Sequence, residues 1–249
     1  MTASSRNLPV PARALAVGAH PDDVEFGAGA TLAKWAAQGC EVSLVVCTDG
    51  SKGTWDPDTD TAELVATRQS EARAAATALG ATGSVHFLGR VDGDLENERS
   101  SRSDLVRVIR QVRPDVLLGH DPWKRYRLHP DHRAAGFLTC DALVAARDPH
   151  FFRDQDLTPH RPSALLLFEA DEPDHAEVVD DAHFRAKLAA LESHRSQFES
   201  TMFIGDGADH EVDEATARFR SEIGVGLADA GAWAGVPLAE RFRFMPTDR

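Results

Sequence analysis

Short apolar segments alternate with longer helical segments over the first 170 residues of this chain, and this alternation restricts its fold more than any other feature. The first apolar segment is rich in small and branched residues, as a buried strand should be. Two helical segments end at a glycine, which favours the turn that terminates a helix. The predicted strands are residues 13–20, 41–50, 84–89, 115–121 and 164–170, and the predicted helices are residues 25–39, 61–80, 101–113 and 130–147.

Strands that alternate with helices along a chain form βαβ units, whose right-handed crossovers build a parallel sheet. We therefore predict an α/β fold, a Rossmann-like three-layer α/β/α arrangement with a mostly parallel sheet. A chain of 249 residues is long enough for one such domain with its own core. We expect a single domain over residues 1–249, with its core in residues 13–175 and a mostly helical extension in residues 176–249 that contains a candidate short strand, "AERFRF".

The composition argues against several classes of function. The chain has 27 Lys and Arg against 40 Asp and Glu, and its net charge of −13 disfavours binding to DNA or RNA. It has no apolar N-terminal signal segment and no run of about 18 apolar residues that would cross a membrane. The three cysteines, Cys40, Cys47 and Cys140, are far apart and form no C-x-x-C motif, which argues against disulfides or a cysteine zinc site. We expect a cytoplasmic protein without nucleic-acid or membrane partners.

Polar side chains follow four of the predicted strands at the point where each strand ends. His20–Asp23 follows the first strand, Thr48–Asp49 the second, Asp92 the third and His120–Asp121 the fourth. In open α/β sheets, ligands bind outside the carboxyl ends of the strands. We therefore expect an active site at the C-terminal edge of the sheet, built from these segments.

The string His-Pro-Asp occurs twice, in "HPDD" at residues 20–23 and in "HPDH" at residues 129–132. Proline is well suited to the first position of a helix, where its missing N–H is harmless, and residues three apart on a helical turn share one face. If a helical turn begins at each proline, the first and fourth residues of each motif face the same way. His20 then lies beside Asp23, whereas Asp22 points to a different side.

The two motifs together supply the donor types of a catalytic zinc site. A histidine and a carboxylate from the first motif and one histidine from the second form a His₂Asp set. Three protein ligands with one open position are typical of catalytic rather than structural zinc. The metal accounts for one of the adjacent carboxylates, Asp23, and leaves Asp22 free beside it to act as a base.

Other interpretations fit the sequence less well. A single HPDD string is equally compatible with a capped helix start and a surface acidic pair, but its recurrence at a second strand end argues against this. A receiver domain has an acidic pair after its first strand, yet it has no place for the HPDH motif. A dinucleotide-binding fold requires the spacing G-x-G-x-x-G, which the early glycines do not form. Histidines without motif context are expected to be surface or core residues: His86, His150, His160, His175, His183 and His210.

The strings "AHPDDVE" (19–25) and "HPDH" (129–132) resemble the PIG-L/LmbE-like superfamily of zinc-dependent N-deacetylases. Members include N-acetylglucosaminyl-phosphatidylinositol de-N-acetylases and bacterial deacetylases of thiol and antibiotic biosynthesis. The resemblance extends to "TRQSEARAAATALG" (67–80), "HFLGRVDGDL" (86–95) and "KLAALESHRSQF" (187–198), and so covers most of residues 14–200. One departure is Arg127, with Tyr126 beside it, where relatives often carry Tyr or Asp, so the identity of any extra oxyanion donor stays open.

The resemblance implies a role for each residue that matches a family motif, with one zinc ion per chain as the cofactor. The matching residues are His20, Asp23 and His132 as zinc ligands, Asp22 as general base, His129 as the group that steadies the oxyanion or protonates the leaving amine, Asp131 as a carboxylate that orients a histidine, and Arg68 and Asp92 as contacts to substrate hydroxyls.

The expected function is zinc-dependent hydrolysis of the N-acetyl group of an N-acetylglucosamine-type sugar or glycoconjugate. Alternatives are a zinc amidase acting on a larger thiol conjugate or natural-product intermediate, and a non-catalytic metal-binding or sugar-binding homologue. Loops 51–60, 90–100 and 148–162 are expected to shape the pocket, and Trp55 serves either to stack on a sugar or to pack. Whether His129 or Asp22 protonates the leaving amine stays open, as does assembly into a homo-oligomer.

Overall fold

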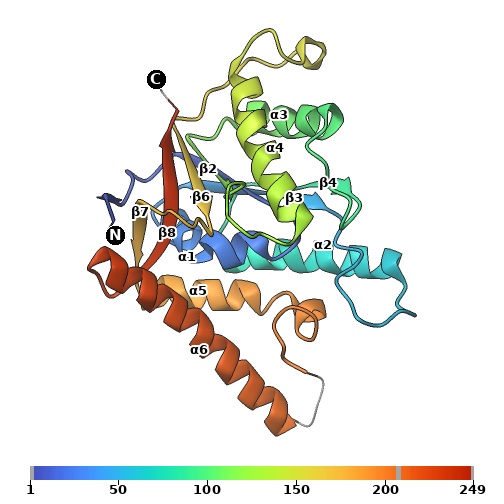
Figure 1. The fold of residues 1–249 in the computed structure, drawn as a ribbon, viewed down its shortest axis with the longest axis vertical. Helices are drawn as coiled ribbons and strands as arrows, with labels where there is room; N and C mark the ends of the chain where they lie inside the picture. The colour runs from blue at the N-terminus through green and yellow to red at the C-terminus, as the bar shows by residue number, and fades with distance from the viewer. Residues whose placement is uncertain (1–2, 206–208, 248–249) are drawn as a thin grey trace.

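An eight-stranded sheet forms the middle layer of the chain in the computed structural model, which describes residues 3–205 and 209–247 (Figure 1). The strands are β1 (Ser5–Arg6), β2 (Arg13–Gly18), β3 (Glu41–Thr48), β4 (Val85–Arg90), β5 (Val116–His120), β6 (Ala164–Phe168), β7 (His175–Val179) and β8 (Leu238–Pro246). Across the sheet they run in the order β1-β7-β8-β6-β5-β2-β3-β4. Strand β8 is antiparallel to its neighbours β6 and β7, and the other neighbouring strands are parallel.

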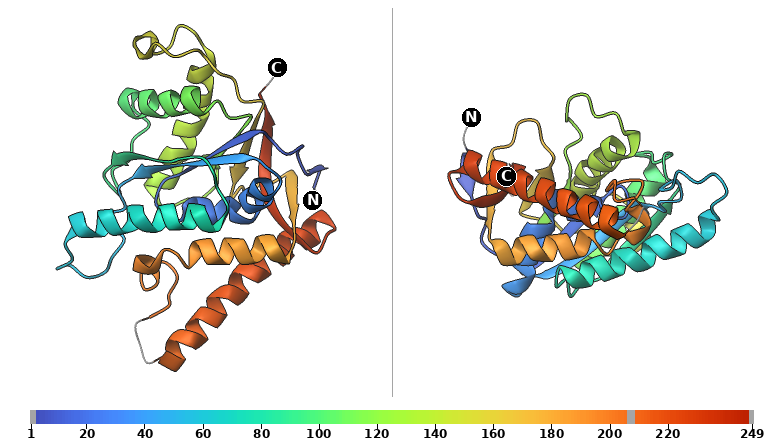
Figure 2. Two further views of the ribbon diagram at one scale, coloured as in Figure 1. Left: turned by 180° about the vertical axis from the view of Figure 1, so that it is seen from behind. Right: turned by 90° about the horizontal axis from the view of Figure 1, so that it is seen from below.

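Helices cover both faces of this sheet (Figures 1 and 2). They are α1 (Asp23–Ala37), α2 (Thr61–Ala78), α3 (Arg99–Val112), α4 (Pro130–Arg147), α5 (Asp181–Leu191) and α6 (Asp209–Ala234). Helices α1, α2 and α5 pack on one face, and α3 and α4 pack on the other. Successive residues of β2 point into opposite layers, because Ala14 and Ala16 pack with α1 whereas Leu15 and Val17 pack with α3 and α4. Among the described residues, no helix is both long enough and apolar enough to cross a bilayer.

The predicted alternation of strands and helices is confirmed, and with it the mostly parallel three-layer α/β fold. The predicted strands correspond to β2–β6 and the predicted helices to α1–α4, with ends that differ by a few residues. The late segment "AERFRF" is also a strand, and it lies within β8, between β6 and β7. The chain after residue 175 therefore adds β7 and β8 to the same sheet, in addition to helices α5 and α6.

A buried ion pair fastens the C-terminal strand to the first layer of helices. Glu240 of β8 accepts a hydrogen bond from Lys187 Nζ of α5 at 2.6 Å. The same carboxylate accepts hydrogen bonds from the backbone N–H groups of Ala30 (3.1 Å) and Thr31 (2.7 Å) in α1. Lys187 also donates to the carbonyl of Phe26 at 2.7 Å. Both charged side chains are buried, so the pair joins β8, α5 and α1 in a region that excludes water.

Removal of the Glu240 carboxylate should therefore cost much more than removal of a surface charge. In Glu240→Ala the buried ammonium of Lys187 loses its counter-charge, and we expect the free energy of unfolding to fall by about 3–5 kcal/mol. The matched control is Arg220→Ala, which breaks an exposed ion pair with Glu192 and should cost less than about 1 kcal/mol. Urea denaturation measures both, and equal losses in the two variants would contradict the role of the buried pair.

Candidate active site

A cavity of about 560 Å³ opens at the carboxyl edge of the sheet. Parallel strands bring their carboxyl ends to one edge, so segments far apart in the sequence meet there. The cavity is lined by the segments that follow β2, β3, β4 and β6, by α2, by the start of α4 and by the segment after α5. The lining residues are His20, Asp22, Asp23, Phe26, Lys52, Gly53, Thr54, Trp55, Arg68, Asp92, Gly93, His129, Pro130, His132, Glu169, Gln197, Ser200 and Thr201.

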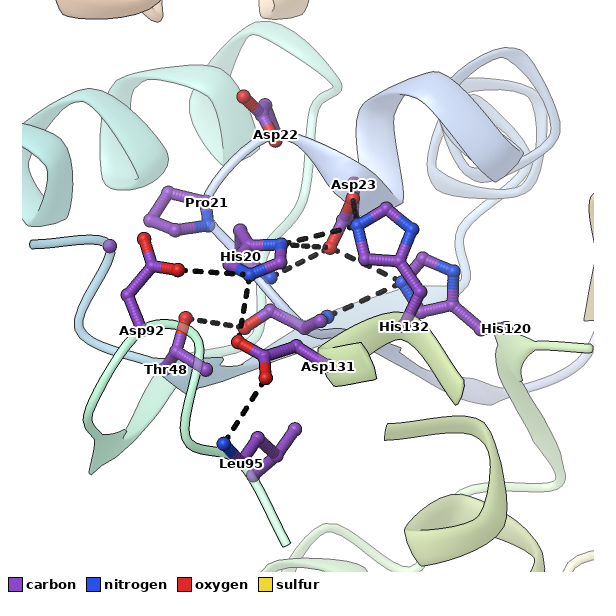
Figure 3. Close-up of polar contacts among 12 residues, drawn as sticks. His20, Pro21, Asp22, Asp23, Thr48, Asp92, Leu95, His120, Asp131 and His132 are labelled. Carbon is purple, nitrogen blue, oxygen red and sulfur yellow. Dashed lines mark hydrogen bonds and ion pairs between the residues drawn. The ribbon is translucent and has the colours of Figure 1, made fainter. Parts of the chain in front are cut away.

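The turn between β2 and α1 sends two adjacent carboxylates to different sides. Asp22 precedes α1 with φ 112° and ψ −28°, a conformation that strains any residue with a side chain. Its side chain makes no capping hydrogen bond, so helix capping does not explain this strain. Figure 3 shows Asp23 directed toward the histidines and Asp22 directed away from them. The strained turn thus separates the two carboxylates, as expected from the sequence. The expected helical turn at Pro21 is wrong, however, because α1 begins only at Asp23 and the left-handed backbone of Asp22 makes the separation.

Two histidines and one carboxylate from the two motifs meet at a single point (Figure 3). His132 Nε2 lies 3.2 Å from His20 Nδ1 and 3.2 Å from Asp23 Oδ1, and His20 Nδ1 lies 3.3 Å from Asp23 Oδ2. Bonds of about 2.0–2.2 Å place the ligand atoms of tetrahedral zinc about 3.3–3.6 Å apart. The donor types are those of a zinc site, and each pair of these residues approaches to such a distance, with Asp23 facing His132 through Oδ1 and His20 through Oδ2.

Further ligand-type side chains surround this point. Overlapping groups of donors that lie within 4.8 Å of one another are His20, His129 and His132; Asp23, His120 and His132; and His20, Asp92 and Asp131. The structure therefore contains a candidate His/Asp metal site at the carboxyl edge of the sheet.

The second nitrogen of His20 is held from behind by a carboxylate. His20 Nε2 lies 3.1 Å from Asp131 Oδ2. Asp131 is itself fixed, because it accepts hydrogen bonds from the backbone N–H groups of Gly93 (2.7 Å) and Leu95 (3.1 Å) in the segment after β4. A metal-binding histidine usually donates its other N–H to a carboxylate in this way. His20 therefore has the surroundings of a ligand that binds through Nδ1.

Negative charge accumulates around His20. Carboxylate oxygens of Asp131, Asp23 and Asp92 lie 3.1, 3.3 and 3.4 Å from its ring nitrogens, and all three groups are buried. Burial alone would lower the pKa of His20, but the hydrogen bonds to Asp131, Asp23 and Asp92 outweigh it and raise the pKa to about 12. The cluster thus demands a cation, either a proton on His20 or a metal ion. Because both compete for Nδ1, low pH should weaken metal binding.

His132 meets the charge requirement of a ligand but has a competing contact. Burial lowers the pKa of His132, Asp23 opposes this, and the charges of His120, His20 and Arg127 bring the pKa to about 4. The ring is therefore neutral at neutral pH. Arg127 Nη1 lies 2.7 Å from His132 Nδ1, and a guanidinium only donates, so Nδ1 accepts and Nε2 carries the hydrogen. A cation held at Nε2 would require the hydrogen to be on Nδ1, and Arg127 Nη1 would then have to move away from that nitrogen.

Asp22 lies in different surroundings, next to Arg68. Arg68 Nη2 is 3.5 Å from Asp22 Oδ2 and donates to the carbonyl of Pro21 at 2.8 Å, while Nη1 donates to the carbonyl of Gly50 at 2.9 Å. Burial raises the pKa of Asp22, the charge of Arg68 partly offsets this, and the neighbouring Asp23 adds to it, which gives a pKa of about 6. A carboxylate with a pKa near the working pH suits general acid–base chemistry.

The other predicted site residues also reach the cavity. His129 precedes α4, and its exposed ring centroid lies 4.6 Å from that of His20 and 4.7 Å from that of His132. Burial and then the charge of His20 lower the pKa of His129, so its imidazole is neutral at neutral pH. Asp92 accepts a hydrogen bond from the backbone N–H of Lys52 at 3.2 Å. Each predicted site residue lines the cavity except the Asp131 carboxylate, which lies behind His20.

The segment after α5 holds one wall of the cavity in place. The carbonyl of Gly53 accepts hydrogen bonds from Gln197 Nε2 (3.0 Å) and Ser200 Oγ (3.2 Å). Gly53 has no room for a side chain, because a Cβ atom there would lie 2.2 Å from Arg68 Nη1. Two residues further on, Trp55 lines the cavity while 73% of it stays exposed. The indole is therefore presented to the cavity rather than packed into the core.

One expectation about the pocket is wrong. Loops 51–60 and 90–100 contribute to the cavity, but loop 148–162 does not, and residues 197–201 line it instead. The physical reason is topological, since loop 148–162 leads from α4 to the start of β6 and thus lies at the amino edge of the sheet. Neither Tyr126 nor Arg127, between which the sequence left an oxyanion donor open, lines the cavity.

Sequence reasoning assigned no role to two groups at this edge. His120 ends β5 and contacts Asp23, and Glu169, directly after β6, contacts His120 and Arg127. Both residues lie at the carboxyl end of a predicted strand. Polar residues at these ends meet at one edge of the sheet, so their positions in the sequence could have identified both as site residues.

Comparison with known proteins places the chain in a family. The family model described as PIG-L: GlcNAc-PI de-N-acetylase matches residues 15–143. Diacetylchitobiose deacetylase of Thermococcus kodakarensis is 36% identical in a region that covers 75% of this chain and 70% of that protein. A 1D-myo-inositol 2-acetamido-2-deoxy-alpha-D-glucopyranoside deacetylase of Actinosynnema mirum is 31% identical over 85% of this chain and 89% of that protein.

A solved structure agrees with these relatives. N,N'-diacetylchitobiose deacetylase from Pyrococcus horikoshii superposes with a TM-score of 0.82 and 30% sequence identity, and the match covers 95% of this chain and 84% of that one. The chain therefore belongs to the PIG-L/LmbE-like family of deacetylases.

The donor geometry predicts which variants lose metal. Asp23→Ala and His132→Ala each remove one of three donors, so purified protein should lose its stoichiometric zinc. His129→Ala is the matched control, because it removes a neighbouring histidine of the same motif and should keep the metal. Elemental analysis of the three proteins measures this. Stoichiometric zinc in both Asp23→Ala and His132→Ala, or its loss in His129→Ala alone, would contradict the assignment.

Proposed function

We propose that this chain is a zinc-dependent deacetylase that hydrolyses the N-acetyl amide of an N-acetylglucosamine-type sugar or glycoconjugate. The observation that carries the proposal is a buried carboxylate, Asp22, held apart from a His₂Asp donor set in the same cavity. Similarity to deacetylases of diacetylchitobiose and of 1D-myo-inositol 2-acetamido-2-deoxy-alpha-D-glucopyranoside supports the class of substrate. A non-catalytic metal-binding homologue would not need a base-type carboxylate in this position.

In this proposal His20 Nδ1, Asp23 and His132 Nε2 hold the zinc ion. When bound, zinc acts as a Lewis acid that polarises an amide carbonyl and lowers the pKa of water toward ~7. Asp22 takes the proton of the attacking water. With a pKa of about 6 it is mostly ionised at neutral pH, and it holds a proton more readily than an ordinary aspartate does. Arg68 positions it through the 3.5 Å contact to Oδ2.

His129 and Asp22 divide the remaining proton chemistry between them. The neutral imidazole of His129 can donate one N–H to the oxygen of the substrate carbonyl as negative charge develops there. The departing nitrogen must be protonated, because an amine anion is a very poor leaving group. After the first step Asp22 carries the water proton, and it is the better donor of the two because a carboxylic acid is a much stronger acid than a neutral imidazole.

The outer half of the cavity suits a carbohydrate. Lys52, Thr54, Ser200 and Thr201 present polar groups of the kind that bind sugar hydroxyls, and Trp55 presents an apolar face. Arg68 and Asp92 line the inner half, beside the metal donors. An aromatic ring among hydroxyl-binding groups favours a ring-shaped polar substrate over a purely apolar one.

A screen for release of a primary amine tests the proposed function. Zinc-loaded protein is incubated with N-acetylglucosamine, diacetylchitobiose and N-acetylglucosaminyl-inositol, and amine and acetate are measured together. We expect equal amounts of both products from at least one of these sugars, and loss of the reaction after a chelator removes the metal. Amine release from none of them, by protein that holds zinc stoichiometrically, would contradict the proposal.

Asp22→Asn should separate catalysis from metal binding. The amide keeps the shape of the carboxylate but cannot take up a proton at neutral pH, so turnover should fall by ~10²–10⁴ while zinc stays bound. Asp23→Asn is the matched control at the adjacent position and should lose zinc. The reverse pattern, an empty site in Asp22→Asn and full activity in Asp23→Asn, would show that the two roles are exchanged.

The pH profile is a separate check on Asp22. A base works only when deprotonated, so the rate should rise with pH as Asp22 ionises, around its pKa of about 6 or lower when a cation lies nearby. The rise of the rate with pH reflects several coupled ionisable groups. The wild-type profile is therefore compared with the profile of Asp22→Asn and is not assigned to one residue. If the rate of Asp22→Asn rises over the same pH range as that of the wild type, Asp22 is not the base.

Trp55→Ala should affect long substrates more than short ones. If the indole contacts a second ring, kcat/KM for diacetylchitobiose should fall by roughly 10-fold, equivalent to about 1.4 kcal/mol of lost apolar contact. The rate with N-acetylglucosamine should change little. Trp123→Ala is the matched control, since Trp123 is also exposed but lines a different depression. Equal losses for both sugars would contradict an outer binding position.

A further inference from the structure

A buried histidine stands behind the candidate metal ligand Asp23 and has no role in the chemistry above. His120 ends β5 and is 1% exposed. Its Nε2 lies 3.2 Å from Asp23 Oδ2 (Figure 3). The same oxygen accepts a hydrogen bond from the backbone N–H of His20 at 2.7 Å. The second oxygen, Oδ1, is the one that faces His132.

The other nitrogen of His120 is held by an ion pair. His120 Nδ1 lies 3.1 Å from Glu169 Oε2, and the same oxygen pairs with Arg127 Nη2. Glu169 follows β6 with φ 59°, a left-handed conformation that is uncommon for a residue with a side chain. A strained backbone at this point places the carboxylate where it meets His120. The contacts thus run from Arg127 through Glu169 and His120 to Asp23.

His120 is placed to act on Asp23 rather than to bind a metal itself. It does not line the cavity, whereas His20, Asp23 and His132 all do. The backbone N–H of Ala19 is directed at the same Nε2 at 3.4 Å, so the end of β2 closes this nitrogen off on that side. His120 stacks on His132, with ring centroids 4.4 Å apart, and thus borders the donors without lining the cavity.

We propose that His120 is a positioning residue, which holds the Asp23 carboxylate through Oδ2 so that Oδ1 faces the metal, and which is itself oriented by the Glu169–Arg127 pair. The inference rests on the proposed metal-dependent function. It adds to the three metal donors two supporting residues, His120 at the end of β5 and Glu169 directly after β6. Ligand carboxylates that are hydrogen-bonded from behind commonly depend on those partners for metal affinity.

The test is the zinc affinity of His120 variants, measured by competition with a chromophoric chelator and independent of turnover. Loss of such a supporting partner typically weakens binding 10–100-fold, so the dissociation constant for His120→Ala should rise by about that factor. His120→Gln should recover most of the affinity, because its amide N–H can donate to Asp23 Oδ2 from a position close to that of Nε2. The visible absorption bands of Co²⁺-loaded protein should keep their positions in both variants, since the ligand set is unchanged.

Two further variants control for the fold. His160→Ala removes a half-buried ring that bonds only the carbonyl of Pro114, far from the site, and should leave zinc affinity unchanged. Glu169→Gln removes the charge that orients His120 and serves if His120→Ala does not fold, with a smaller loss in the same direction.

The possible results of these experiments distinguish failure of this inference from failure of the proposed function. Unchanged zinc affinity in His120→Ala would overturn this inference and leave the proposed function standing. Loss of zinc as complete as in His132→Ala, with altered Co²⁺ bands and no recovery in His120→Gln, would make His120 a ligand and also overturn it. Absence of zinc binding by the wild-type chain would overturn the inference together with the proposed function.

Discussion

Buried negative charge at the carboxyl edge of the sheet is the constraint on which the site depends. Asp23, Asp92 and Asp131 all lie within hydrogen-bonding or ion-pairing reach of His20. Carboxylates are costly to bury unless a positive charge or N–H donors balance them. Asp131 is balanced by the backbone N–H groups of Gly93 and Leu95, whereas Asp23 faces only histidine rings and the N–H of His20. The arrangement therefore favours a cation at Asp23, and a divalent metal supplies it without protonating His20.

The turn at Asp22 converts one acidic pair into two groups with different chemistry. Histidines lower the pKa of Asp23 well below its usual range, although burial alone would raise it. Burial raises the pKa of Asp22, and the charge of the neighbouring Arg68 offsets this only in part. The strained φ of 112° at Asp22 is thus the local cost of separating the proposed ligand from the proposed base.

Much of this was predictable because the information is local in the sequence. The alternation of apolar and helical segments predicted the sheet, and the paired HPD motifs predicted the residues that meet in Figure 3. Other features depend on partners far along the chain. Strand β7 was not predicted, since it buries His175 and Glu177, whose polarity hides the strand until Ser5 and Lys34 bond them.

The supporting role inferred for His120 also depends on a partner far away in the sequence. The sequence placed His120 at a strand end, but its contact to Asp23 exists only because β5 lies directly beside β2 in the sheet. Loop 148–162 was wrongly assigned to the pocket for a related reason. It leads from α4 to the start of β6, so the direction of β6 and not the composition of the loop decides at which edge of the sheet it lies.

The central proposal is that Asp23 rather than Asp22 binds the metal together with His20 and His132. A crystal structure of zinc-loaded protein, with anomalous difference maps collected on both sides of the zinc absorption edge, tests it most directly. We expect one anomalous peak bonded to His20 Nδ1, His132 Nε2 and Asp23, with Asp22 outside bonding distance. A peak bonded to Asp22, or one on the Asp92–Asp131 side of His20, would contradict it.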